Sequence, residues 1–380
     1  MEPKERARTA LTGGIPDKVP LGEFAIDYDT AERILGHETY GRAKAKCQIA
    51  YWEGRRDEVV QSLVEDTISL YKKLDVFDIV NLCAQTLGLV PPKGYRPEVP
   101  RRVDDATWEY ADGRVLKYSP VTADITLIHD PHQWTRAISV DDYPLAWDYH
   151  EPDSSVYELV DGVVVALGSA RFILGPFPRA EQWVQPGGME RSLLLMVEEP
   201  KLVERALQSS LARSRDEQAR WANRGIDGVL DGTDWAFRSG PFMSPRMWRR
   251  FCYPALEANV RAAHAAGLVY VQHACGNNWA ILDGFLEAGI DCYQSIQATA
   301  EMDLAKVRAT TRGRMALWGG VSVEHLVSGT PEDVRQDVRR AMGIARDGGG
   351  FVLGSSHSIA VGTCYDNFMA MLDELDRLRG

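Results

Sequence analysis

The sequence predicts an α/β fold, a single (β/α)8 TIM barrel of parallel strands. In the C-terminal half, five β-rich runs that each begin with glycine alternate with segments of helical periodicity, and three similar runs lie earlier in the chain. Parallel strands need helical connections, and eight such strands close a barrel. The 380 residues, 45% of them hydrophobic, can form one large core, so we expect residues 1–380 to be one domain.

The expected strands are β-rich runs bounded by glycine or other turn residues. In chain order they span residues 17–27, 74–82, 161–174, 225–233, 267–276, 289–297, 313–321 and 349–359. The helices expected in the C-terminal half are 245–264, 278–287, 302–311, 331–346 and 364–379, and residues 28–73 are expected to be mainly helical. One helix start is specific, because Thr330 supplies a capping hydroxyl, Pro331 suits the first helical position, and two acids follow at the positive end of the helix dipole.

Residues 91–160 interrupt this alternation. Within them, Ala111-Asp112-Gly113 lies between two runs of alternating polarity, which predicts a β-hairpin. We therefore expect an insertion between early barrel strands, near one end of the barrel.

Charge and composition exclude several classes of protein. The net charge of −11 argues against binding to the phosphate backbone of nucleic acids, which needs a basic face. The sequence contains no run typical of a signal peptide and none approaching the roughly 20 apolar residues of a membrane-spanning helix, so we expect a cytoplasmic protein. Six cysteines in such a chain do not indicate a disulfide framework.

The strongest candidate for chemistry is the sequence HACGNN at 273–278. Side chains alternate along a strand, so His273 and Cys275 share one face at its carboxyl end, where barrel enzymes hold their reactive groups. An imidazole and a thiolate at this spacing can bind one Zn²⁺ ion. His357 emerges at the same rim from the last strand and is the expected third ligand, with Cys364 as the competing candidate. The alternative is that the cysteine is a small buried hydrophobe and the histidine a core residue.

Other strand ends supply candidate catalytic and substrate-binding residues. Asp231 and Asp234 follow the fourth strand and are expected to act as metal ligand, proton acceptor or partner of a substrate amine, although solvated turn residues are the alternative. Glu23, at the end of the first strand, can supply a displaceable oxygen ligand. Gln294 and Gln297 are expected to bind substrate through hydrogen bonds, because an amide does not titrate.

Two further features are expected to contact substrate. Arg171, on the third strand, can hold a carboxylate through two hydrogen bonds, or can balance the charge of Asp231. Trp318 and Gly320 belong to a Trp-Gly-Gly segment on the seventh strand, which is expected to permit close approach of the backbone to a ligand, with a tight strand-to-loop turn as the alternative.

These residues, in this order, resemble the uroporphyrinogen decarboxylase superfamily, a group of (β/α)8 barrels. The resemblance covers most of the chain and is clearest from about residue 225 onward. It rests on PDKVP, LDGTDW, SPRMWRRFCYP, HACGNN, GIDCYQSIQ, MDLAKVR, WGGV and GSSHSIAVGTCYDNFMAML. The superfamily includes decarboxylases of cyclic tetrapyrroles, which use no cofactor, and zinc-dependent methyltransferases that work with corrinoid proteins.

The two branches of the superfamily are matched to different degrees. The methyltransferase branch is similar in its His-x-Cys pair, which His273 and Cys275 match. Its third ligand is normally a cysteine after strand eight, whereas this chain offers His357, so the resemblance implies either an altered zinc site or a site without metal. The decarboxylase branch has an arginine-rich segment near the N-terminus, whereas residues 20–30, PLGEFAIDYDT, contain several acids and no arginine.

The resemblance therefore implies a corrinoid-linked, zinc-dependent methyltransferase acting on a small molecule, with zinc and cobalamin as cofactors and a homodimer as the assembly. No cobalamin-binding Asp-x-His-x-x-Gly segment is present, so we expect the cobalamin to come on a separate corrinoid protein or as a free ligand. One alternative is a metal-free decarboxylase or lyase, in which Asp231 or Asp234 stabilises a protonated intermediate and Arg171 holds a carboxylate. The other is a ligand receptor without catalytic activity.

Overall fold

A curled sheet of seven parallel strands forms the centre of the molecule. The computed structural model describes residues 1–180, 187–218, 224–345 and 348–379. The strand order in the sheet is that of the chain. The strands are β1 (Ile79–Asn81), β6 (Phe172–Leu174), β7 (Gly228–Asp231), β10 (Val269–His273), β11 (Cys292–Gln294), β12 (Ala316–Val321) and β13 (Phe351–Ser355).

Residues 20–22 connect the two edge strands of this sheet. The Leu353 N–H donates to the Pro20 carbonyl (2.9 Å) and the Gly22 N–H donates to the Leu353 carbonyl (3.1 Å), while the Asp78 N–H donates to the Leu21 carbonyl (2.9 Å). The first expected strand, 17–27, therefore forms no continuous strand: besides these contacts it makes one more short bridge, between Ile26 and Ile359, where the Asp27 N–H donates to the Ile359 carbonyl (2.9 Å).

Helices cover the outside of the sheet, as expected for parallel strands. In the second half they are α6 (Gly188–Glu198), α7 (Pro200–Gln218), α8 (Pro245–Phe251), α9 (Tyr253–Ala265), α10 (Leu282–Ala288), α11 (Leu304–Thr311), α12 (Val323–Ser328), α13 (Pro331–Ala345) and α14 (Tyr365–Arg379). The capping signal before α13 is confirmed, because the Asp333 N–H donates to Thr330 Oγ1 (3.3 Å) and the Thr330 N–H donates to Asp333 Oδ2 (2.8 Å). The first half contains α1 (Pro3–Leu11), α2 (Tyr28–Leu35), α3 (Lys44–Trp52) and α4 (Arg56–Lys73), which confirms the mainly helical stretch.

The strand expected at 161–174 is wrong over most of its length. Residues Glu158–Leu167 form α5, and only Phe172–Leu174 form a strand, β6. The buried residues of α5 recur at helical spacing and face α4, where Gly162 lets the two helices approach closely; a Cβ at Gly162 would lie 2.7 Å from Val64 Cγ1. A continuous apolar run fits a buried strand and a buried helix equally well, and here the helix forms.

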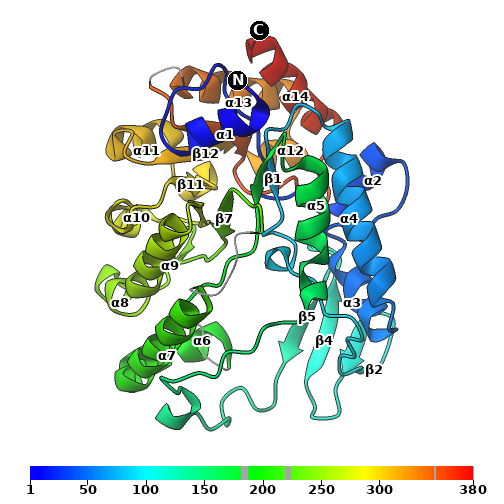
Figure 1. Cartoon of the computed structure of the whole chain (residues 1–380), viewed down its shortest axis with the longest axis vertical. Coiled ribbons are helices and arrows are strands. Elements are labelled where there is room, and N and C mark those ends of the chain that lie inside the picture. The colour runs from blue at the N-terminus through cyan, green and yellow to red at the C-terminus, as the bar shows by residue number, and fades with distance from the viewer. Residues whose placement is uncertain (181–186, 219–223, 346–347, 380) are drawn as a thin grey trace.

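The insertion forms a four-stranded antiparallel sheet between β1 and α5. Its strands are β2 (Arg101–Arg102), β3 (Thr107–Glu109), β4 (Val115–Ser119) and β5 (Asp124–His129). The turn between β3 and β4 contains Gly113 at φ +86°, a conformation that favours glycine. Figure 1 shows both chain termini at one end of the molecule, and this sheet, α6 and α7 at the other.

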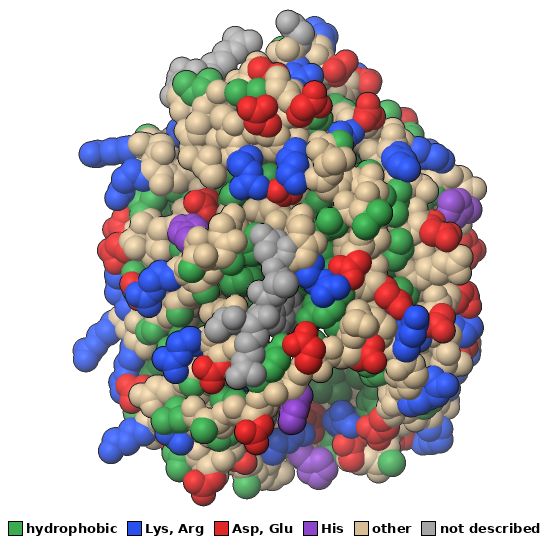
Figure 2. All heavy atoms as spheres, in the orientation of Figure 1, with side chains coloured by type: hydrophobic (Ala, Val, Ile, Leu, Met, Phe, Trp, Pro, Cys, Tyr) green, Lys and Arg blue, Asp and Glu red, His purple; other side chains and the backbone are tan. Residues whose placement is uncertain are grey.

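On the face drawn in Figure 2, basic and acidic side chains are interspersed, without a large area of one sign. Among the described residues, no helix combines the length and apolar character needed to cross a membrane.

Candidate functional site

The structure brings His273, Cys275 and His357 together at the carboxyl end of the strands. Cys275 Sγ lies 3.3 Å from His273 Nε2, and the three ligand atoms all lie within 4.8 Å of one another. In the described part of the chain they are the one group of three such side chains close enough to hold a metal ion. A tetrahedral zinc ion bound to nitrogen at ~2.05 Å and sulfur at ~2.3 Å separates its ligand atoms by about 3.4–3.6 Å, so the observed sulfur–nitrogen distance fits zinc.

The protonation of the two imidazoles suits a metal. His273 Nδ1 hydrogen-bonds Gln294 Oε1; an amide oxygen only accepts, so the proton is on Nδ1 and the Nε2 lone pair faces Cys275. His357 Nδ1 contacts Ser358 Oγ at 2.9 Å. Burial lowers the pKa of His273 and lowers that of His357 to about 4, so both rings are neutral at pH 7.

The thiol of Cys275 is protonated when no metal is bound. Burial, and secondarily the negative charge of Asp234, raise the pKa of Cys275 to about 12. A metal ion binds the thiolate, so binding would displace this proton.

Phe24 covers the two histidines. Its ring stacks on His273, with centroids 4.2 Å apart and planes 27° apart, and lies tilted 5.9 Å from the ring of His357. The two imidazoles meet edge to face at 5.6 Å. Phe24 therefore fixes the orientation of His273 and excludes water from one side of the cluster.

Asp234 and two amides hold the loop that carries Cys275. The Cys275 N–H donates to Asp234 Oδ1 (2.7 Å), and the same oxygen lies 3.9 Å from His273 Nε2. Asn278 Nδ2 donates to the carbonyls of Ala274 and Cys275, at 3.1 and 3.0 Å. Gln297 Oε1 accepts from the next backbone N–H in the loop, that of Gly276, at 3.2 Å. Asp234 thus reaches the cluster, while Gln297 supports its loop.

Glu23 is fully buried beside β13. Both its carboxyl oxygens contact Ser355: Oε1 accepts from the backbone N–H at 2.8 Å and Oε2 hydrogen-bonds the side-chain hydroxyl at 2.6 Å. Burial raises the pKa of Glu23 to about 8. The Glu23 carboxyl group, which was predicted to supply a displaceable oxygen ligand to the metal, is therefore bound to Ser355, outside the cluster of three.

Asp231 is saturated with hydrogen-bond and ionic partners. Its carboxylate accepts from the Tyr270 hydroxyl (2.8 Å) and the Thr233 hydroxyl (2.7 Å), and forms an ion pair with Arg179. The charge partner predicted for Asp231 was Arg171, and the structure places Arg179 there instead.

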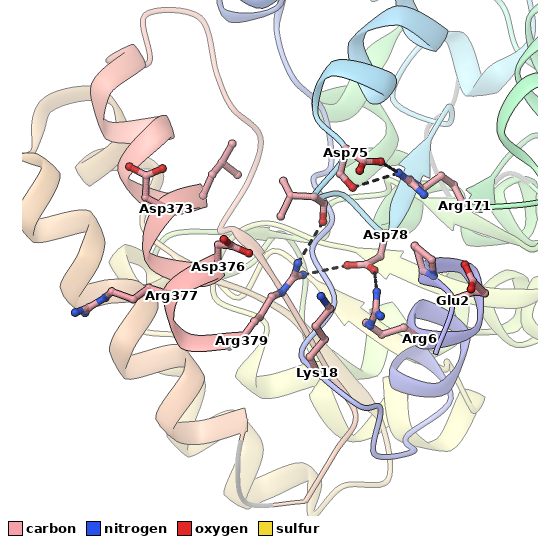
Figure 3. Close-up of a pocket in the computed structure, with 13 residues that line it drawn as sticks. Glu2, Arg6, Lys18, Asp75, Asp78, Arg171, Asp373, Asp376, Arg377 and Arg379 are labelled. Atoms are coloured by element: carbon pink, nitrogen blue, oxygen red, sulfur yellow. Dashed lines mark hydrogen bonds and ion pairs between the residues drawn. The ribbon is translucent and has the colours of Figure 1, made fainter.

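Arg171 lies at the opposite end of the barrel, so its expected place in the substrate pocket is wrong. It immediately precedes β6 and pairs with Asp75, in a cleft of about 790 Å³ at the amino ends of the strands. Figure 3 shows this pair next to Asp78, which lies between Arg6 and Arg379. Because the first half of the expected strand is helix α5, Arg171 comes before the strand and cannot reach the rim.

The Trp-Gly-Gly sequence lies within strand β12 and packs against protein. The Trp318 side chain is fully buried and its Nε1 donates to the Gly22 carbonyl at 3.1 Å. A Cβ at Gly320 would lie 2.6 Å from Cβ of Ala341, so this glycine makes room for α13. The backbone at Gly320 does approach another group closely, as expected, but that group is helix α13 and not a ligand. Cys364 is exposed before α14, outside the cluster.

Sequence reasoning missed three residues of this region: Phe24, Arg179 and Asn278. Asn278 stands within the HACGNN motif, and its place after a strand end was a usable signal. The sequence gives no such signal for Phe24 and Arg179, because an aromatic residue beside Glu23 and an arginine in a loop are compatible with many environments.

A family model and one solved structure among the known proteins compared agree with this fold. The family model described as Uroporphyrinogen decarboxylase (URO-D) matches residues 155–378, more than half of the chain. A solved methyltransferase from Methanosarcina mazei is similar over 100% of both chains, with a TM-score of 0.67 and 18% sequence identity. A sugar phosphate isomerase/epimerase from Parabacteroides distasonis aligns over 85% of this chain and 92% of its own, at a TM-score of 0.33 and 10% identity. No curated protein shows a significant sequence match. With its parallel strands, its covering helices and the matched segment, the chain belongs to the uroporphyrinogen decarboxylase family.

Proposed function

We propose that this protein is a zinc-dependent, corrinoid-linked methyltransferase, which moves a methyl group between a small molecule and cobalamin or a corrinoid protein. The observation that carries the proposal is the meeting of His273, Cys275 and His357 within 4.8 Å at the carboxyl ends of the strands. Barrel enzymes perform their chemistry at this end. The fold shared with the methyltransferase from Methanosarcina mazei is consistent with it.

The three side chains would hold zinc with one position left open. Zinc there would act as a Lewis acid towards the sulfur, oxygen or nitrogen atom that exchanges the methyl group. Gln294 keeps the lone pair of His273 Nε2 directed at the site, and Phe24 shields the rings from water on one side. Asp234, 3.9 Å from His273 Nε2, is placed to accept a proton or to hold the reacting group near the cluster.

Cobalamin would supply the bond that carries the methyl group, and the protein would supply position and charge. The chain has no Asp-x-His-x-x-Gly segment, so the cobalamin would arrive on a separate protein or as a free ligand. The two reactants would meet at the carboxyl end of the barrel, where His273, Cys275 and His357 lie.

Metal analysis of the purified protein tests the zinc proposal. We expect about one zinc per chain, lost in the double variant His273→Ala/Cys275→Ala. The matched control is His37→Ala/Cys364→Ala, which removes the same two residue types at exposed positions and should keep the metal. Stoichiometric zinc retained by the first double variant would refute the site.

Methyl transfer is tested with free methylcobalamin as the donor and a panel of small thiols as acceptors. The proposal would be supported if the methylcobalamin absorbance is lost only when both zinc and Cys275 are present.

The second candidate function, a metal-free decarboxylase, is favoured by one observation: the ion pair of Arg179 and Asp231 lines a cavity where a carboxylate could bind. Turnover that is unchanged after exhaustive chelation would favour that alternative.

A further inference from the structure

A cavity of about 820 Å³ opens beside the cluster, at the carboxyl ends of β6 and β7. Segments from across the chain line it: the loop after β1, the end of the insertion, the segment after β6, the end of α7 and the segment after β7. Its walls are largely apolar or aromatic and include Leu89, Val90, Val156, Tyr157 and Phe177. The volume and lining are typical of sites for small molecules.

Arg179 is held rigidly in the wall of this cavity. Asp231 pairs with Nη1 of its guanidinium, and Asp231 is itself fixed by the hydroxyls of Tyr270 and Thr233. The backbone next to Arg179 is clamped as well, because Asn259 accepts from the Ala180 N–H (2.8 Å) and donates to the Ala180 carbonyl (3.2 Å). The arginine therefore has a fixed position, which is what a binding residue requires.

The cavity and the metal cluster share one wall, the segment of residues 231–234. Asp231 and Thr233 line the cavity. The alternate residues face the cluster: Gly232 lies against Phe24, and Asp234 accepts from the Cys275 N–H at 2.7 Å. The cavity and the cluster therefore lie on two sides of the same backbone segment.

The charges that line the cavity limit what it can bind. The described lining contains two arginines and two acids, and Arg213 is paired with Glu217 (2.8 Å) and more than half exposed. Arg179 is the less exposed of the two arginines, with 18% of its side chain exposed, and its five N–H donors allow it to contact Asp231 and a ligand at the same time. Arg179 can balance the charge of one anionic group. The cavity therefore suits a molecule with a single anionic group better than a molecule with many carboxylates.

We propose that Arg179 binds the single carboxylate or sulfonate of a substrate whose remaining body is apolar or aromatic. The proposal rests on the methyltransferase function above for what happens to that substrate, but not for its binding. It assigns to the cavity a substrate class, molecules with one anionic group. In this respect the chain differs from enzymes that act on polycarboxylates.

Binding of three small probes tests the proposal. Benzoate and benzenesulfonate carry an anion on a ring, and benzamide is the neutral counterpart of benzoate. We expect the wild-type protein to bind at least one of the two anions more tightly than benzamide, as measured by ligand-observed NMR, and the stronger anion identifies the group. Arg179→Met should weaken binding of that anion about ten- to a hundredfold, because a charge-assisted hydrogen bond is lost. Arg213→Met, the matched control at the exposed end of the cavity, should change it less than about threefold.

A second variant, for which we expect tighter instead of weaker binding of the anion, makes the test specific. Asp231→Asn keeps an oxygen for Arg179 but removes the competing negative charge, so it should bind the anion more tightly than the wild type. If Arg179→Met fails to fold because Asp231 is left unpaired, Arg179→Met/Asp231→Asn replaces it, as a pair of neutral side chains. Circular dichroism of each variant shows whether it is folded.

Three results would overturn the proposal: equal affinity for the anions and benzamide, unchanged anion binding in Arg179→Met or its double variant, or no probe bound at millimolar concentration. The probes need no metal, so these outcomes are independent of the zinc analysis. If His273→Ala/Cys275→Ala loses its zinc but binds the anion normally, both proposals are supported separately.

Discussion

Glu23 should make the free energy of unfolding depend on pH, and the substitution Glu23→Gln should remove this dependence. Its carboxyl group is fully buried against Ser355, and burial raises its pKa from 4.5 to about 8. Between these values the folded protein holds a proton that the unfolded chain has lost, so stability falls as the pH rises. The stabilising contribution is complete below pH 4.5 and is lost as the pH rises through 8.

The magnitude follows from the same two values. Each pKa unit corresponds to ~1.36 kcal/mol, so the full difference between 4.5 and 8 is about 5 kcal/mol. The titration curves of the two states place about 4 kcal/mol of this between pH 5 and 8.5. Glu23→Gln removes the titration. It also disturbs the hydrogen bonds with Ser355, at a cost of roughly 1–3 kcal/mol that does not change with pH.

Urea unfolding of wild type and Glu23→Gln from pH 5 to 8.5 measures this effect. We expect the stability of the variant relative to wild type to rise by about 4 kcal/mol across the range, whatever its starting value. Glu374→Gln is the matched control: burial acts to raise the pKa of Glu374, but hydrogen bonds from Arg377 and Arg339 outweigh it and hold that pKa at about 2. Its difference from wild type should stay constant above pH 5. A constant difference for Glu23→Gln as well would refute the reasoning.

The metal cluster could be predicted from sequence because its geometry is local to two strand ends. The predicted alternation places His273 and Cys275 on one face. In the structure β10 ends at His273 and β13 ends at Ser355, so Cys275 and His357 each lie two residues beyond the carboxyl end of a strand. Parallel strands align their carboxyl ends, so the three residues converge without further information.

The contacts between strands could not be predicted in the same way. Gln294 reaches His273 because these residues are register partners of β10 and β11, and a single sequence does not give the register. The error at Arg171 has a different cause, since the apolar run before it forms a helix and shifts the strand towards the C-terminus. The arginine near the carboxyl end of β6 is therefore Arg179.

Two further changes test how the cluster is built. Gln294→Ala removes the acceptor that fixes the tautomer of His273, so zinc affinity measured by chelator competition should fall about 10- to 100-fold, and unchanged affinity would remove Gln294 from the site. Gly276→Ala should lower the free energy of unfolding by about 2–5 kcal/mol, because Gly276 has φ +83° and a Cβ there would lie 2.3 Å from the Ala236 carbonyl oxygen. Gly289→Ala, at φ +78° with open space around it, separates the two causes, since it bears only the backbone cost of about 1–2 kcal/mol. If the two glycine variants lose equal stability, the close packing of the Cys275 loop contributes nothing, and the rigidity inferred for that loop would have to come from the hydrogen bonds of Asp234, Asn278 and Gln297.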